Sequence, residues 1–191
     1  MTDKMNDKHL FLKTSICPPF PDHLCSLMFG MGCFWGVEKL FWQQQGIYTT
    51  AVGYAGGTTE NPSYQEVCTG QTGHTEVVLL IYDQQKMSLQ KLLELFWQNH
   101  DPTQGMRQGN DRGSQYRSAI YLNNDKEIAQ AETSKQHYQN VLAQNHYGQI
   151  TTEIKIEKTF YYAEDYHQQY LIKNPNGYCN LRGTGIEFSE C

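Results

Sequence analysis

Apolar residues along this chain gather in short runs that polar, glycine-containing segments separate. Three of these runs, at 24–31, 47–54 and 75–82, are nearly continuous or rich in β-branched and aromatic residues, which is typical of buried strands. Shorter runs at 116–122 and 152–158 predict two more strands. The last of them alternates apolar and polar residues, so we expect one of its faces to meet water.

Helical periodicity lies between these runs. From Leu89 onward, apolar residues recur at the i, i+3, i+4, i+7, i+8 spacing of an amphipathic helix, and Ser88 is a suitable N-cap. A second helix is expected after the first strand, with a stop at Gly46. The stretch 125–147 predicts a long helix, and 163–172 predicts a short one.

The order of these elements, β-α-β-β-α-β followed by α-β, defines the fold that we expect. It favours an α+β two-layer sandwich with a mixed sheet, helices on one face and a ferredoxin-like core. A chain of 191 residues is long enough for one domain with a sizeable core. We therefore expect a single domain over 1–191, with an extended, proline-containing arm at 1–23 and a flexible tail at 174–191.

Composition excludes several classes of protein. The net charge is −5 and no basic block is present, which argues against nucleic acid as a partner. The chain contains no run of about 18 apolar residues, so no membrane span is predicted. The first residues lack the features of a signal or transit peptide, so we expect a cytoplasmic protein. The six cysteines show no C-x-x-C spacing, and in a reducing compartment they suggest buried thiols with one or two reactive ones.

Cys33 is the candidate nucleophile. It follows Gly32 where the first apolar run gives way to helical periodicity, so we expect it in the first turn of a helix. Free backbone N–H groups and the positive end of the helix dipole favour an ionised, reactive sulfur there. A buried cysteine that packs as a small hydrophobe fits the same position about equally well.

Other residue types point to what such a sulfur could attack. Phe34 and Trp35 follow Cys33 directly, and two rings beside a nucleophile would form an apolar slot suited to a methyl or thioether group. Core packing is the alternative for both rings. Glu76 is the second residue of an apolar run, where burial would keep a proton on its carboxyl for donation to a polar oxygen. The alternative is an ionised carboxylate at a strand end in water.

Several segments resemble, in order, those of the peptide methionine sulfoxide reductase A family. The signature is GCFWGVE at 32–38, and it is followed by PSYQEVC at 62–68, GHTEVV at 73–78, GNDRGSQYRS at 109–118 and NGYCN at 176–180. The likeness covers roughly residues 24 to 185. It implies a thiol oxidoreductase that reduces methionine (S)-sulfoxide, free or protein-bound, and so repairs oxidised proteins.

The resemblance also implies roles for individual residues. Glu76 would supply a proton to the sulfoxide oxygen, and Tyr64 and Tyr116 would donate hydrogen bonds to the same oxygen. Asp111 would orient the site or the substrate backbone. Phe34 and Trp35 would line the pocket for the substrate methyl group.

By the same resemblance, Cys179 is the resolving cysteine. Attack on the sulfoxide would leave Cys33 as a sulfenic acid, which Cys179 would convert to a disulfide. Thioredoxin is the expected reductant and partner, no metal or organic cofactor is expected, and we expect a monomer. Cys191 could be a further recycling cysteine, and Asn180 stands where the family commonly has glycine.

Two other functions fit the residues. A cysteine hydrolase or acyltransferase would pair Cys33 with His74 or His167 and an acid such as Asp165. A metal-binding or redox-sensing module would use Cys33, Cys68, Cys179 and nearby histidines. Of these three functions, only the sulfoxide reductase requires a resolving cysteine.

Overall fold

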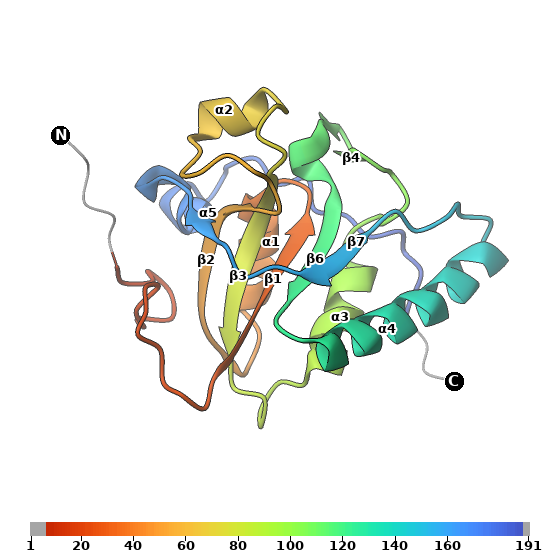
Figure 1. Ribbon diagram of the computed structural model, residues 1–191, viewed down its shortest axis with the longest axis horizontal. Coiled ribbons are helices and arrows are strands. Elements are labelled where there is room, and N and C mark those ends of the chain that lie inside the picture. Colours follow the sequence, from red (N-terminus) through yellow and green to blue (C-terminus); the bar gives the residue numbers. More distant parts are fainter. Residues whose placement is uncertain (1–6, 189–191) are drawn as a thin grey trace.

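A mixed sheet organises the computed structural model, which describes residues 7–188 (Figure 1). Its strand order is β7-β6-β1-β3-β2-β8. The strands of this sheet are β1 (Cys25–Met31), β2 (Ile47–Ala55), β3 (Thr75–Tyr82), β6 (Ser118–Leu122), β7 (Glu153–Ile156) and β8 (Tyr161–Tyr162). Neighbouring strands are antiparallel except for β6 and β7, which are parallel. The mixed α+β class expected from the sequence is confirmed.

The helices are short apart from one. They are α1 (Phe34–Trp42), α2 (Tyr64–Cys68), α3 (Leu89–Gln98), α4 (Asp125–Gln144) and α5 (Tyr170–Lys173). A small hairpin of β4 (Arg107–Gln108) and β5 (Asp111–Arg112) and the 3₁₀ turns η1 (Ser114–Tyr116) and η2 (Asp165–His167) complete the described elements. No helix among residues 7–188 is both long and apolar enough to cross a membrane.

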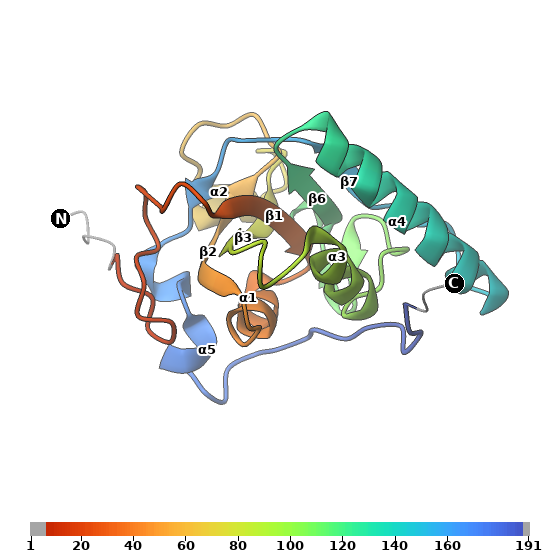
Figure 2. The same cartoon turned by 90° about the horizontal axis from the view of Figure 1, so that it is seen from below.

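The main core lies between one face of the sheet and the apolar faces of α1, α3 and α4. Figure 2 shows α1 and α3 on the same side of the sheet. Phe29 of β1 packs on Phe41 of α1 and Phe96 of α3, with ring centroids 5.5 and 4.8 Å away. The alternation of β1 explains this, because its odd-numbered residues all point to that face. The even-numbered Met28 belongs to a smaller cluster on the opposite face with Tyr121 and Phe160.

The two ends of the described chain cross the outside of this frame. Residues 7–16 lie against β2, where the Thr14 hydroxyl donates to the Tyr48 carbonyl at 2.6 Å. Residues 174–188 contain no helix or strand and run outside α1 and α3 toward α4 (Figure 2). There the Tyr138 hydroxyl donates to the Ile186 carbonyl at 3.0 Å. Both segments are therefore tied to the frame at several points.

Two helical segments depart from the sequence prediction. The stretch 58–73, a polar segment for which no helix or strand was predicted, contains α2, because Ser63 and Glu66 form a capping box that starts a helical turn. The helix expected over 163–172 is broken into η2 and α5. The break falls at Gln169, whose φ of 48° lies in the left-handed region and ends any continuous helix.

Truncation of Phe29 to alanine tests the central packing. Phe29 has no exposed surface and touches rings from two helices, so we expect Phe29→Ala to lower the free energy of unfolding by about 3–5 kcal/mol. Urea unfolding measures this loss. Met106→Ala, at a side chain that is 60% exposed, serves as control and should change it by less than about 0.5 kcal/mol. Equal effects of the two substitutions would contradict this account of the core.

Candidate active site

Cys33 lies between the end of β1 and the start of α1, at the N-cap position of the helix. Gly32 makes the turn with a φ of 89°, and a Cβ there would lie 2.7 Å from the Gln108 side chain. Only glycine fits both the conformation and the close approach. Gln108 is itself fixed, because its amide bonds to the backbone N–H and carbonyl of Asp101 at 3.1 and 2.8 Å. The turn thus presents Cys33 in one position, just before the helix rather than in its first turn.

The Glu76 carboxyl faces the same turn. Its Oε2 accepts a hydrogen bond from the Phe34 backbone N–H at 3.0 Å, and the residue is only 2% exposed. Burial raises the pKa of Glu76 to about 8, against the opposing effect of the Phe34 N–H. The buried, protonated acid expected from the sequence is therefore what the geometry provides, next to the residue that follows Cys33.

The surroundings of Cys33 bear on the two alternatives that the sequence left open for its sulfur. Burial raises the pKa of its thiol well above the ordinary value, and the nearby Glu76 carboxyl raises it further, although hydrogen bonding by the Trp35 backbone N–H lowers it. The start of the helix does favour a thiolate, but the loss of water around the sulfur outweighs this effect. The raised pKa favours a neutral thiol at rest, which is the buried cysteine of the two alternatives that the sequence left open.

Aromatic rings form one side of the site. The Trp35 indole stacks on Tyr170 with centroids 3.8 Å apart, and its Nε1–H donates to His167 Nδ1 at 3.0 Å. Phe34 is 1% exposed and packs edge-on against His167 at 5.1 Å, so this ring belongs to the core at the base of the site. Trp35 is partly exposed, which leaves it as the ring with a free surface for a ligand.

The two tyrosines singled out from the sequence come from separate loops. Tyr64 begins α2, and its ring lies 4.6 Å from that of His167. Tyr116 ends η1, which contacts β3. Burial raises the pKa of both phenols, and the Glu76 carboxyl raises each further, so both remain hydrogen-bond donors beside that acid.

The C-terminal segment brings a second thiol to α1. A Cβ placed on Gly36 would lie 2.8 Å from Cys179 Sγ, so the Cys179 sulfur rests on the helix one turn after Cys33. The neighbouring Tyr178 hydroxyl donates to Asp111 Oδ1 at 3.0 Å, and the Asn180 amide lies 3.5 Å from Asp111 Oδ2. Cys33 and Cys179 are both free thiols. Asp111 thus holds the chain on either side of Cys179, while Cys191 lies outside the described residues.

The histidines considered as partners of Cys33 are engaged elsewhere. His74 Nδ1 accepts from the Gly57 N–H at 3.1 Å, and its Nε2 lies 2.7 Å from the Thr59 carbonyl. His167 Nδ1 accepts from Trp35. Within residues 7–188 no hydrogen bond joins either ring to Cys33, and no group of three or more His, Cys, Asp or Glu is arranged to hold a metal ion.

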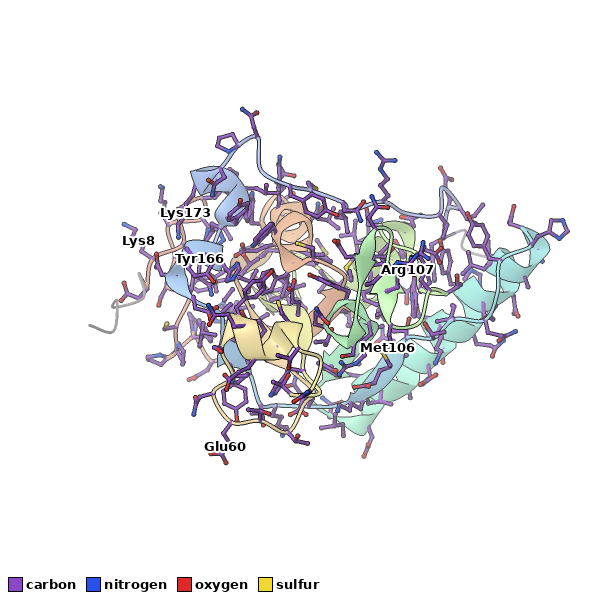
Figure 3. The ribbon with its side chains drawn as sticks, turned by 90° about the horizontal axis from the view of Figure 1, so that it is seen from above. Lys8, Glu60, Met106, Arg107, Tyr166 and Lys173 are labelled. Carbon is purple, nitrogen blue, oxygen red and sulfur yellow. The ribbon has the colours of Figure 1, made fainter. Side chains whose placement is uncertain are left out.

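The segment after β8 contributes more contacts to the site than the sequence predicted. Glu164 accepts from the Tyr54 hydroxyl at 2.9 Å and from the Tyr64 N–H at 2.8 Å, which joins β2 to α2. His167 lies among four rings, at centroid distances of 4.1 to 5.7 Å. The grouping of two acids, Glu164 and Asp165, with His167 was the available signal. Figure 3 shows the face of the protein on which α1 lies, with Tyr166 and Arg107 labelled on opposite sides of that helix.

A thiol at a helix start, opposed by a buried carboxylic acid and followed by a second free thiol, defines a thiol-dependent oxidoreductase. Comparison with known proteins makes this class specific. The family model described as peptide methionine sulfoxide reductase matches residues 25–187, and the chain belongs to this family.

Individual relatives agree with this assignment. MsrA of Rippkaea orientalis is 63% identical over 169 residues, which cover 88% of this chain and 78% of the relative. The human mitochondrial peptide methionine sulfoxide reductase is 60% identical over 168 residues, covering 88% and 72%.

Solved structures share the fold. Methionine sulfoxide reductase A of Corynebacterium diphtheriae superposes with a TM-score of 0.82 at 44% identity, covering 91% of this chain and 85% of that one. Reduced Mxr1 of Saccharomyces cerevisiae gives 0.80 at 34%, covering 90% and 99%. A complex of Mxr1 with Trx2 gives 0.59 at 21%, covering 90% and 96%, a level at which only the fold is compared.

Replacement of Glu76 by glutamine tests its protonation. Native Glu76 holds its proton to about pH 8, whereas a glutamate in the unfolded chain releases it near 4.5. Because the native state then binds more protons, this group lowers the free energy of unfolding as pH rises through that window, by at most about 1.4 kcal/mol per pH unit. We expect Glu76→Gln to lack this decrease in the free energy of unfolding, because glutamine does not titrate.

Urea unfolding of both proteins at a series of pH values measures the difference. The other titrating groups are common to both and cancel when the two curves are subtracted. Parallel curves for wild type and Glu76→Gln would contradict a protonated acid at this position.

Proposed function

We propose that this chain reduces methionine (S)-sulfoxide, protein-bound and free, to methionine and so repairs oxidised proteins. The observation that carries the proposal is the hydrogen bond from the Phe34 N–H to Glu76, because it sets a buried acid beside the Cys33 sulfur. An acid that keeps its proton near neutral pH can give it to a sulfoxide oxygen. Selectivity for the S epimer rests on family membership alone.

In the first step, Cys33 attacks the sulfur of the sulfoxide. Glu76 gives a proton to the oxygen, and the Tyr64 and Tyr116 phenols donate hydrogen bonds to it, as the donors of an oxyanion hole do. Donation to the oxygen makes the substrate sulfur more electrophilic, and the thiol passes its proton to the Glu76 carboxylate as the bond between the two sulfurs forms. That bond then breaks as the oxygen transfers from the substrate sulfur to the Cys33 sulfur. Methionine leaves with the electron pair of the broken bond, and Cys33 is left as a sulfenic acid.

The substrate side chain is held by the aromatic side of the site. The exposed part of the Trp35 indole, with Phe34 at its base, offers an apolar surface for the methyl group on sulfur. Asp111 has carboxylate oxygens that could accept from a backbone N–H of the substrate. It bonds to Tyr178 in this structure, so a substrate would compete with the C-terminal segment for this group.

In the second step, Cys179 attacks the sulfenic acid. A disulfide forms between Cys33 and Cys179, and one water molecule leaves. The contact of Cys179 with Gly36 supports this pairing, because it places the second sulfur one helical turn from the first. An external dithiol then reduces the disulfide. We infer that thioredoxin is this reductant, and the solved complex of Mxr1 with Trx2 supports a partner of that kind. The reaction needs no metal or organic cofactor.

Further expectations from the sequence remain proposals. The order β6-β1-β3-β2, antiparallel throughout, supports a ferredoxin-like core. We also propose a single catalytic domain with an arm at 1–23 and a tail at 174–191 that moves to deliver Cys179, a monomeric state and a cytoplasmic location. The hydrolase alternative is not favoured, because His74 and His167 bond to other groups.

Replacement of Cys179 by serine separates these functions. With thioredoxin, its reductase and NADPH, we expect Cys179→Ser to release about one methionine per enzyme and then stop, because the sulfenic acid has no resolving thiol. Cys33→Ser should release none. The measurement is methionine formed from each separated sulfoxide epimer. Undiminished turnover by Cys179→Ser would remove the resolving role, and activity on the R epimer alone would contradict the stated substrate.

Substitution of Gly36 by alanine tests the pairing of the two sulfurs. The added Cβ would lie 2.8 Å from Cys179 Sγ and displace it, so we expect disulfide formation after one equivalent of sulfoxide to slow by about tenfold. Loss of free thiols measures this rate, while release of the first methionine reports the preceding step. Gly148→Ala, where a Cβ would meet nothing within 4 Å, is the matched control. Equal rates in the two variants would contradict the pairing.

A further inference from the structure

The Glu38 carboxyl is buried inside the protein and takes no part in the reaction proposed above. Glu38 lies on α1 and has no exposed surface. Its two oxygens accept from the Gln169 backbone N–H at 2.9 Å, from the Gln169 side-chain amide at 2.9 Å and from the Thr50 hydroxyl at 3.0 Å. All three partners are donors, which is the arrangement that satisfies an ionised carboxylate.

Two of these bonds fix the conformation of one residue. Gln169 has a φ of 48°, in the left-handed region that residues other than glycine rarely adopt. Such a conformation persists where surrounding contacts hold it, and Glu38 binds Gln169 by both its backbone and its side chain. Gln169 is also the joint between η2 and α5, so its conformation sets the direction in which α5 leaves.

The two elements joined at Gln169 carry the two partners of Trp35. His167, at the end of η2, accepts the hydrogen bond from the Trp35 indole N–H at 3.0 Å. Tyr170, at the start of α5, stacks on the indole at 3.8 Å with 14° between the planes. Trp35 and Glu38 are three residues apart on α1 and so face the same segment. The contacts form a closed ring from Trp35 through this segment to Glu38 and back along the helix.

Stability alone gives no reason for a carboxylate at this place. Burial raises the pKa of Glu38 to about 7 even though the three donors lower it, which shows that the charge is held at a cost. At a buried position, apolar residues of similar volume commonly stabilise the folded protein as well as charged ones do, or better. The arrangement does supply a fixed geometry, because hydrogen bonds from a buried acceptor restrict direction in a way that apolar contacts do not.

We propose that Glu38 is a positioning residue for substrate binding. Through Gln169 it holds His167 and Tyr170 against the indole, so that Trp35 is a rigid wall for the methyl and thioether groups of methionine sulfoxide. The inference rests on the proposed function for the identity of that substrate. A wall of this kind contacts the substrate before and during reaction alike, so its loss weakens binding and leaves the chemical step nearly unchanged.

The test compares Glu38→Gln with Thr50→Val. Glu38→Gln keeps the volume but sets an NH₂ group against donors, whereas Thr50→Val removes the third hydrogen bond and leaves both bonds to Gln169 in place. One readout is the indole ¹⁵N–H resonance of Trp35, assigned among the three tryptophans by its loss in Trp35→Phe. The other is the sulfoxide concentration that gives half the maximal rate of methionine release in a single turnover.

We expect Glu38→Gln to move the Trp35 indole proton upfield as its bond to His167 weakens. The half-saturating concentration should rise about tenfold, with the maximal rate within about twofold of wild type. Thr50→Val should change neither. An unmoved resonance with unchanged half-saturation in folded Glu38→Gln would overturn the proposal, as would equal effects of the two variants.

A substitute variant and a second readout cover the cases in which Glu38→Gln does not fold or the wild-type protein is inactive. Where Glu38→Gln does not fold, Gln169→Ala takes its place, because alanine removes the side-chain bond to Glu38 and disfavours the left-handed conformation that this bond helps to hold. The same shift and rise are then expected, and their absence overturns the proposal. Where wild-type protein reduces no sulfoxide, the proposed function fails, but the Trp35 resonance still decides whether Glu38 positions the indole.

Discussion

The hydrogen bond between the Phe34 N–H and the Glu76 carboxyl joins the start of α1 to the central sheet. Strand register brings the two together. In the antiparallel pair β1–β3, Phe29 lies opposite Val78. This register, continued by two residues, sets the end of β1 beside Glu76. The turn at Gly32 then redirects the chain so that the Phe34 N–H, in the first helical turn, points at the carboxyl. The sheet thus places the acid, and the turn places the sulfur.

This geometry also sets the charges. Two ionisable groups in one poorly hydrated space cannot both carry negative charge at low cost. Burial is the main cause of the raised pKa of each, and the Glu76 carboxyl raises the pKa of the Cys33 thiol further. The resting site therefore holds a proton on each group, and a polar oxygen bound between them would find donors already in place. Nucleophile and acid are activated together by the group they act on. A thiolate already present at Cys33 would make Glu76 a weaker acid, because a negative charge beside the carboxyl raises its pKa.

The sequence determines the strands more clearly than the site. The runs at β1, β2 and β3 were predicted nearly to the residue, because continuous burial requires continuous apolar sequence. α2 was missed although its capping box stands at Ser63 and Glu66, since five residues are too few to show periodicity. The sequence could not decide between a thiolate and a buried thiol at Cys33, because helix position is local information, whereas burial of the sulfur depends on segments far along the chain. For the same reason, the hydrogen bond from Trp35 to a histidine 132 residues away leaves no local pattern.

The spacing of residues on α1 explains why so short an element carries so much of the site. Positions three apart share a face of a helix. Cys33 and Gly36 face the C-terminal segment, which is where the Cys179 sulfur rests. Trp35 and Glu38 face the segment that contains η2 and α5, and both bond to it. Between these faces, Phe34, Val37 and Phe41 anchor the helix in the core. Because one short helix fixes all three directions, the nucleophile, the aromatic side of the site and the contact for the second sulfur keep their mutual geometry when the loops around them move.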